Sequence, residues 1–129
     1  MKKILLGFLI LLLSAPVAAQ RRLAVPPYLT CDPNQLTAWM GEILHLDRQG
    51  NRISLRMSTD FDTQESLQVD YQTEAALMEH MRLDGVPFSQ GDWSRLYQPD
   101  GKFRDKLRAV IWLCEDRETQ PVINWQPPG

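Results

Sequence analysis

Apolar and polar residues alternate along the chain in short blocks, and this pattern predicts a domain built mainly from β-strands. The block RISLRMS, residues 52–58, places an apolar side chain at every second position, as a half-buried strand does. A mostly apolar run precedes it at residues 36–47, and Gly50 lies in the short polar break between the two blocks. Because glycine readily adopts the positive φ of a tight turn, the two blocks predict a β-hairpin.

Three further alternating blocks follow, at residues 67–71, 92–97 and 107–114, and the last has the strongest strand pattern. Between the first two of these, segment 73–83 is rich in helix-forming residues, and Thr73 is suited to its N-cap. We therefore expect a mainly β domain with one helix, in the order β-β-β-α-β-β. This is the order of a five-stranded OB-like barrel. An SH3-like roll or another small α+β sheet would show a similar pattern.

Both ends of the chain differ from this alternating centre. The first residues combine a positive start, a ten-residue apolar run and small residues, the pattern of a secretory signal cleaved between Ala19 and Gln20. The apolar run is shorter than the roughly 20 residues that span a membrane. Near the other end, Trp125 lies in a polar, proline-rich stretch, where we expect it to dock on the domain or on a partner. The predicted organisation is a signal peptide at 1–19, an arm at 20–35, a barrel domain at 36–114 and a tail at 115–129.

The charge balance argues against a nucleic-acid partner. Cleavage removes Lys2 and Lys3, which lowers the 14 basic residues to 12, against 16 acidic ones, for a net charge near −4. Binding to nucleic acid needs a basic face, which this composition does not favour. The signal predicts a periplasmic or secreted bacterial protein with no membrane span after cleavage. The expected partner is an envelope protein or glycan.

The two cysteines of the chain, Cys31 and Cys114, both remain after cleavage. Paired cysteines are the usual state in an oxidising compartment, so we expect a disulfide that ties the arm to the last predicted strand. In the simple chain model, closing so long a loop stabilises the fold by roughly 4–5 kcal/mol. The alternatives are two free thiols or a metal-binding pair.

Polar side chains on the second and third predicted strands form a candidate ligand-binding face. In OB proteins this face and the adjoining loops are the usual ligand surface. Two arginines there would suit a carboxylate or a sugar acid, which a guanidinium binds through two parallel hydrogen bonds. Alternatively, the side chains pair with one another across the strands. The face consists of Arg52, Ser54, Arg56, Gln68 and Asp70.

The segment ALMEHM, residues 76–81, places methionines beside one of the two histidines, as a soft-metal site would. On a continuous helix, Met78 and His80 lie about 200° apart around the axis, so one ion cannot bind both. Met78 and Met81 instead share a face with Leu77, which predicts a core stripe with His80 toward solvent. An extended segment would return Met78 and His80 to one face.

The stretch WMGEILHLDRQGNRISLRM, residues 39–57, resembles the first hairpin of the small periplasmic copper- and silver-binding OB proteins of metal efflux systems. The shared features are a glycine-started strand, an Ile/Leu-x-Leu/Ile-Asp turn and a second strand of the form Ile-x-Leu/Ile. The resemblance implies an exported barrel that carries Cu(I) or Ag(I) on soft ligands. The residues of this chain that could serve are His45 and Met57, with Met78 or His80 as further candidates.

No motif of an enzyme is evident in the sequence. It lacks Gly-x-Ser-x-Gly, His-Glu-x-x-His and a glycine-rich phosphate loop, and we expect no cofactor. The sequence therefore predicts a non-enzymatic binding module that uses the polar face and the loops at 47–51 and 98–103. A periplasmic Cu(I) or Ag(I) carrier is one alternative. A small hydrolase, with carboxylates facing each other across a groove, is the other.

Overall fold

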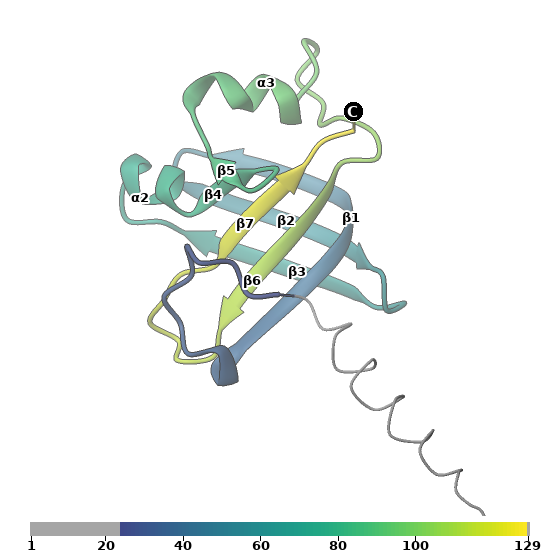
Figure 1. Ribbon diagram of the computed structural model, residues 1–129. Coiled ribbons are helices and arrows are strands. Elements are labelled where there is room, and N and C mark those ends of the chain that lie inside the picture. Colours follow the sequence, from purple (N-terminus) through teal and green to yellow (C-terminus); the bar gives the residue numbers. More distant parts are fainter. Residues whose placement is uncertain (1–23, 129) are drawn as a thin grey trace, which may run out of the picture.

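The computed structural model describes residues 24–128 and shows a mainly β domain with one mixed sheet (Figure 1). The predicted signal peptide and its cleavage after Ala19 lie outside the described residues. No helix within 24–128 is long and apolar enough to cross a membrane. The strands are β1 (Leu36–Gln49), β2 (Arg52–Thr59), β3 (Gln64–Asp70), β4 (Met81–Leu83), β5 (Val86–Pro87), β6 (Arg108–Cys114) and β7 (Val122–Gln126). The helical elements are η3 (Pro33–Gln35), α2 (Glu74–Glu79), η4 (Gln90–Asp92) and α3 (Trp93–Leu96).

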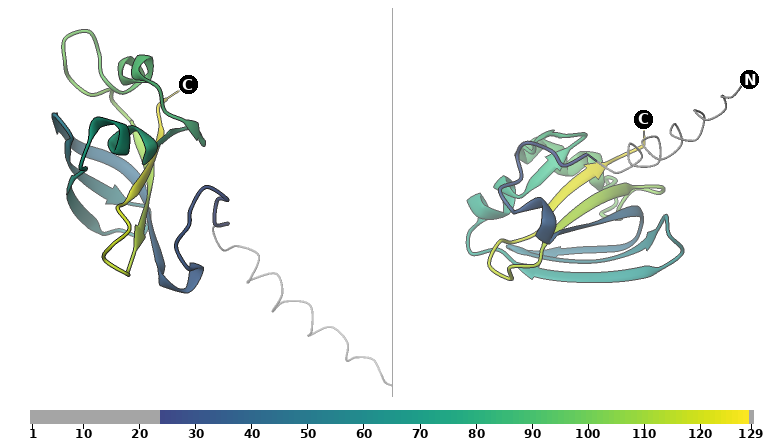
Figure 2. Two further views of the ribbon diagram at one scale, coloured as in Figure 1. Left: turned by 90° about the vertical axis from the view of Figure 1, so that its left-hand side faces the viewer. Right: turned by 60° about the horizontal axis from the view of Figure 1, so that its bottom comes forward.

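The seven strands follow the order β3-β2-β1-β6-β7-β4-β5. Strands β3 and β5 stand at the two ends of this order, and no pairing joins them, so the sheet is not closed. The mainly β class is confirmed, but the closed five-stranded OB-like barrel is not what these strands form. Figure 2 shows that the sheet instead curves, so that β1–β3 and β6–β7 lie as two facing layers.

Strand β1 joins the two layers because it pairs with β2 along one half and with β6 along the other. Gly41 lies where these halves meet and is paired on both sides, with Thr59 of β2 and Ala109 of β6. A Cβ atom at Gly41 would overlap the backbone oxygen of Ser58 and lie 2.7 Å from the Thr59 Cα. Glycine at this position therefore allows the close approach of β2 at the bend of β1.

The predicted helix over residues 73–83 is shorter than expected. Its N-cap is confirmed, since the Thr73 hydroxyl oxygen accepts a hydrogen bond from the Ala76 N–H at 3.0 Å. The helix α2 ends at Glu79, and residues 81–83 form β4, which runs parallel to β7. The helical pattern breaks there because the two apolar side chains of β4 alternate inward and pair with a strand from the far end of the chain.

The segment 92–97, predicted as the fourth strand, forms the end of η4 and then α3. Ser89 is the N-cap of η4, and its backbone N–H donates to the Asp92 carboxylate at 2.9 Å, as in a capping box. Leu96 is fully buried, and Trp93 packs against the core three residues before it. A spacing of three fits one turn of helix, so this short alternating block was compatible with either structure.

The proline-rich stretch near the end of the chain was predicted as a tail, but residues Val122–Gln126 form β7 inside the sheet. Ile123 and Trp125 alternate inward and are fully buried, so Trp125 is a core residue of its own domain and not a ring that docks from a tail. The Trp125 indole N–H donates to the Met81 sulfur at 3.0 Å. The domain therefore extends beyond its predicted boundary at residue 114. The strand was missed because only two apolar residues alternate there, between prolines.

The predicted disulfide between Cys31 and Cys114 is present, with its Cα atoms 6.1 Å apart. It connects the arm to the last residue of β6. Between the layers lies a single hydrophobic core. Its largest fully buried side chains are Trp125, Ile53, Met57, Leu77, Met81, Leu96, Leu107, Ile111 and Ile123.

Candidate functional site

The predicted ligand-binding residues lie together on the outer face of β2 and β3. Arg52 Nε donates to Asp70 Oδ1 at 2.7 Å, and both side chains are about half exposed or more. Ser54 Oγ donates to Gln68 Oε1 at 3.3 Å. Four of the five residues therefore pair across the two strands, which is the alternative that the sequence left open.

Arg56 differs from the other four residues of this face. It lies opposite His45 of β1 and Ser66 of β3, it is exposed, and none of the ion pairs among residues 24–128 includes it. A cationic side chain on this face is thus free to meet an external acidic group.

The outward edge of β3 is a feature that sequence reasoning missed. The Thr59 N–H donates to the Thr63 carbonyl and the Tyr71 N–H donates to the Asn51 carbonyl, which fixes the phase of the β2–β3 ladder. In an antiparallel pair, alternate residues direct their backbone groups toward the partner strand. Every second residue of β3 therefore directs its N–H and C=O away from β2. These residues are Gln64, Ser66, Gln68 and Asp70.

One of these outward groups has a partner, because the Gln120 side-chain amide donates to the Asp70 carbonyl at 2.8 Å. Within the described chain, the outward backbone groups of Gln64, Ser66 and Gln68 have no hydrogen-bond partner. They form a free edge, which we call the β3 edge. The expected closed barrel would have had no such edge, so only the observed strand order reveals it.

Two of the four candidate metal ligands lie on opposite faces of the β1–β2 hairpin. His45 is exposed beside Arg56, whereas the Met57 side chain is fully buried and faces the core. A β-strand sends successive side chains to opposite faces, so Met57 cannot reach the side on which Arg56 and His45 lie. The structure does not bring this pair together.

The other two candidates, Met78 and His80, border different pockets. Met78 borders a surface pocket with Phe88, while His80 follows the last residue of α2. The His80 ring is half-buried 5.2 Å from the Tyr71 ring, and its Nδ1 lies 2.6 Å from the Ala76 carbonyl oxygen. The ring is therefore less exposed than expected, because the helix ends before His80 and the ring packs beside Tyr71 at the edge of a pocket.

In the described part of the chain, three groups with metal-ligating atoms do lie close together: Cys31, Cys114 and Asp116. Both sulfur atoms are already bonded to each other, so they are not available as thiolate ligands. The Asp116 carboxylate accepts hydrogen bonds from the backbone of Glu118 and Thr119, and these hold its pKa below the usual value. The cluster is a structural turn beside a disulfide.

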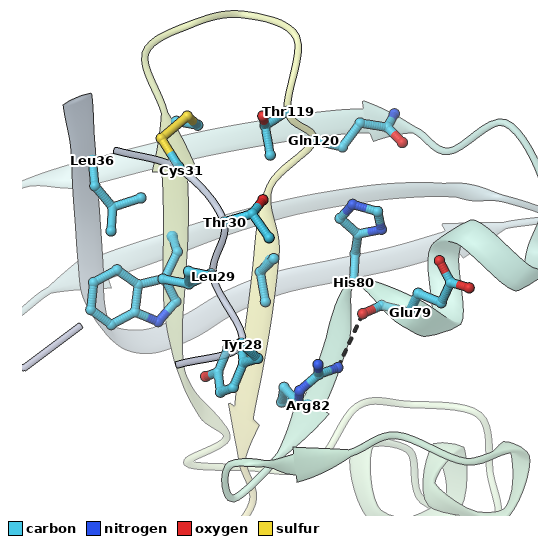
Figure 3. Close-up of a pocket in the computed structure, with 13 residues that line it drawn as sticks. Tyr28, Leu29, Thr30, Cys31, Leu36, Glu79, His80, Arg82, Thr119 and Gln120 are labelled. Carbon is cyan, nitrogen blue, oxygen red and sulfur yellow. Dashed lines mark hydrogen bonds between the residues drawn. A yellow bond between two sulfur atoms is a disulfide. The ribbon is translucent and has the colours of Figure 1, made fainter. Parts of the chain in front are cut away.

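A pocket of about 210 Å³ lies between the arm and the outer face of the sheet, and we call it the arm pocket (Figure 3). Arg82 of β4 borders it, and its guanidinium carbon lies 4.5 Å from the centroid of the Tyr28 ring. Burial raises the pKa of Tyr28, and the neighbouring Arg82 opposes this shift. The residues that line the pocket are Tyr28, Leu29, Thr30, Cys31, Leu36, Glu79, His80, Arg82, Trp112, Cys114, Thr119, Gln120 and Val122.

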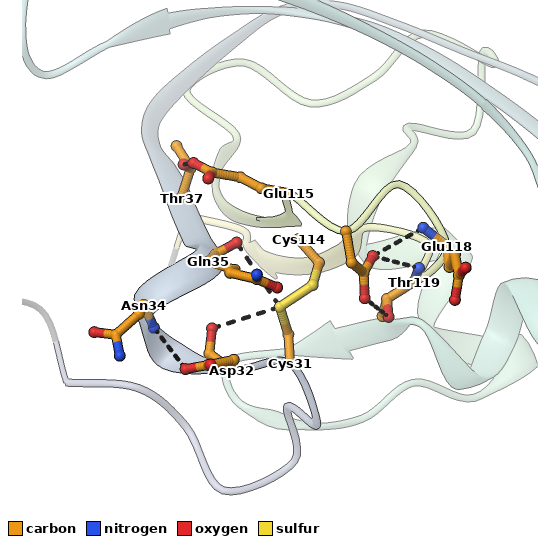
Figure 4. The surroundings of a disulfide bond; sticks show 10 residues. Cys31, Asp32, Asn34, Gln35, Thr37, Cys114, Glu115, Glu118 and Thr119 are labelled. Atoms are coloured by element: carbon orange, nitrogen blue, oxygen red, sulfur yellow. Dashed lines mark hydrogen bonds between the residues drawn. A yellow bond between two sulfur atoms is a disulfide. The ribbon is translucent and has the colours of Figure 1, made fainter.

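The disulfide forms one end of the arm pocket and fixes the arm in place (Figure 4). Beside it, the Asp32 carboxylate accepts the Asn34 N–H at 3.0 Å at the start of η3. On the other side of the bond, Thr37 donates to the Glu115 carboxylate at 3.1 Å. These contacts hold the two chain segments that the disulfide joins, so the pocket has a defined wall.

The segment 47–51, predicted as a loop of the binding surface, consists of the end of β1 and the turn to β2, and its Arg48 lies beside α3. The Arg48 guanidinium carbon is 4.2 Å from the centroid of the Trp93 ring, and Phe88 packs edge-on against the same ring at 4.9 Å. Burial raises the pKa of Tyr97, and Asp47 nearby raises it further. Trp93 is thus enclosed by aromatic and cationic groups. Its indole N–H is buried with no partner in the described structure.

Searches against protein-family models, curated proteins and solved structures found no match to this chain.

Proposed function

We propose that this protein is an exported, non-enzymatic binding module that holds an extended segment of an envelope partner protein along the β3 edge. The observation that carries this proposal is the set of unpaired backbone groups on Gln64, Ser66 and Gln68. An added strand would supply alternating N–H and C=O groups at the same spacing. A glycan has no such backbone, so the edge favours a protein partner.

The length and composition of β3 suit this role. The strand has seven residues in unbroken register with β2, and it contains no proline, lysine or bulge. Proteins commonly protect long edge strands with such features, because unprotected edges pair with other chains. Here the edge keeps its capacity for pairing at Gln64, Ser66 and Gln68.

Arg56 adds a preference for an acidic partner. Its neighbour on β3 is Ser66, whose side chain is short. An added strand would lie two strand spacings, about 9.6 Å, from β2, a gap that the long Arg56 side chain and an acidic side chain can close over the short Ser66. We therefore expect the bound segment to carry a carboxylate opposite Ser66.

Proline substitution tests the β3 edge. Ser66→Pro removes one outward N–H and places a ring on the edge, while the ladder to β2 does not use that N–H. We expect the variant to fold and to lose most capture of its partner from an envelope extract, as quantified by mass spectrometry. Ser66→Ala keeps the N–H and serves as the matched control with full capture.

Variants of the polar face provide the second part of this test. If partner binding used the face alone, the combined change Arg52→Ala and Arg56→Ala would abolish capture and Ser66→Pro would preserve it. That result would overturn the edge proposal. We expect the double variant to fold and to bind more weakly through the loss of Arg56, without losing the interaction.

A Cu(I) or Ag(I) carrier and a small hydrolase remain alternatives from the sequence alone. The carrier has no support in the described geometry, because His45 and Met57 face opposite sides of their hairpin. The β3 edge is thus the basis of the proposal.

A further inference from the structure

The arm pocket combines an apolar wall with a held cation. Trp112 of β6 is only 6% exposed, and with Leu36 and Val122 it forms the wall on the sheet side. The pocket volume of about 210 Å³ equals about seven times the space that one water takes in the liquid. This is room for a small organic group rather than for a large ligand.

Arg82 is fixed in this pocket by contacts that leave part of its guanidinium unused. Its Nη1 donates to the carbonyl oxygens of Glu79 at 3.0 Å and Met81 at 2.9 Å, and the Tyr28 ring stacks on the group. Within residues 24–128, Arg82 has no ion pair, and its Nε and Nη2 make no hydrogen bond. The free Nε and Nη2 form one edge of the planar fork, which matches the two oxygens of a carboxylate.

The other titratable groups of the pocket do not neutralise Arg82. Glu79 is the carboxylate among the lining residues, it is exposed, and Figure 3 shows its carboxylate directed away from the guanidinium. The His80 imidazole also lines the pocket, in addition to the Trp112 indole. The pocket is therefore suited to a negative group next to an apolar body.

We infer that the arm pocket binds a carboxylate attached to a small apolar group. The carboxylate would receive two hydrogen bonds from Nε and Nη2 of Arg82, and the apolar part would lie against Trp112. Such a group belongs either to a free organic acid or to the C-terminus of a peptide. The site does not use the β3 edge, so each proposal can fail without the other.

Titration of the isotopically labelled protein with benzoate, followed by amide and indole NMR, tests this inference. We expect saturable shifts of the Trp112 indole N–H and of the Leu29 and Thr30 amides. Benzamide has the same ring without the charge, and we expect it to bind at least tenfold more weakly. Equal binding of benzoate and benzamide would overturn the inference.

Two substitutions of Arg82 separate charge from geometry. We expect Arg82→Gln to weaken benzoate at least tenfold, and Arg82→Lys to give an intermediate loss because lysine cannot form the fork. The matched control is Arg95→Gln, an exposed arginine on α3, which should bind as the wild type does. If the amide spectrum shows that Arg82→Gln does not fold, Arg82→Lys still decides the question. Wild-type affinity of Arg82→Lys for benzoate would refute bidentate binding.

Three further probes distinguish the source of the carboxylate. The first is N-acetyl-Ala-Phe with a free C-terminus. If it binds at least tenfold more tightly than benzoate, and at least tenfold more tightly than its own C-terminal amide, the natural ligand is the C-terminus of a peptide. Similar affinities for the peptide acid and benzoate identify a free organic acid. Inorganic phosphate that binds as tightly as benzoate would overturn the specificity for a carboxylate with an apolar body.

Discussion

Two consecutive parts of the molecule are built in different ways. The hairpin region, residues 36–70, consists of three long paired strands, with one shift of the β1–β2 register between Ile43 and His45. The connector region, residues 71–107, consists of short elements, the longest of which is the six-residue helix α2. Backbone ladders organise the first region, while caps and side-chain contacts organise the second.

The connector region depends on the hairpin region for its position. Arg48 of β1 stacks on Trp93 and forms an ion pair with Glu74 at 3.7 Å. Tyr71, the first residue of the connector region, donates its backbone N–H to the Asn51 carbonyl of the hairpin region at 3.0 Å. The comparison teaches that the regular sheet serves as a scaffold. The short elements keep their conformation through contacts with it.

Breaking the hairpin region should have the largest effect. In Gly41→Val, the new side chain would meet the backbone of Ser58 and Thr59, so β1 and β2 could not keep their register. We expect a loss of at least about 3 kcal/mol in the free energy of unfolding. Urea unfolding followed by circular dichroism measures it.

The matched control lies in the connector region. A Cβ at Gly91 would have no atom within 4 Å, and its backbone does not require glycine. Gly91→Ala should change the unfolding free energy by no more than about 0.5 kcal/mol. A Gly41→Val variant as stable as Gly91→Ala would show that the bend of β1 does not need glycine.

Tyr71→Phe tests a contact between the start of the connector region and the segment that precedes β7. The Tyr71 side chain is 3% exposed, and burial raises the pKa of its phenol above the usual value. Tyr71→Phe removes the bond to the Pro121 carbonyl and should cost about 1.5 kcal/mol at neutral pH.

The pH dependence of the same variant gives a second measurement. Because the folded pKa of Tyr71 is raised, its stabilising contribution is complete below the unfolded pKa of about 10 and falls as pH rises above it. Above pH 10, the free energy of unfolding of the wild type should fall by about 1.4 kcal/mol more per pH unit than that of Tyr71→Phe. Parallel stability curves of the two proteins above pH 10 would contradict the burial of a neutral phenol.

The smallest effect is expected at the N-cap of α2. Thr73→Ala removes the acceptor for the Ala76 N–H and should cost about 1 kcal/mol in the unfolding free energy. Thr73→Ser keeps the hydroxyl and should stay close to the wild type. Hydrogen exchange should rise in the connector region and not in β1 or β2, and equal rises in both would contradict the separation of the two regions.

The sequence predicted the parts of the fold that depend on local pattern. Strands β1, β2 and β6 were expected near their observed bounds, and Cys31 and Cys114 were correctly paired. The missed elements depend on partners elsewhere in the chain. Met81 and Leu83 become a strand only because β7 lies beside them, and no window around residue 81 contains that information.

The candidate site shows the same division. The side-chain face of Arg52 and Arg56 followed directly from the two-residue period of a strand. The β3 edge follows from which strand lies last in the order, and the arm pocket follows from where the disulfide places the arm. Both arise from contacts between distant segments, so they required the three-dimensional structure.

The disulfide has a consequence for how the protein would withstand proteases. Cys31 and Cys114 are 83 positions apart and enclose β1 through β6. A single nick at any peptide bond between them would leave both fragments covalently joined, with β1 still inserted between β2 and β6. Nicked protein would migrate on a gel as one species until a reductant separates it into two fragments.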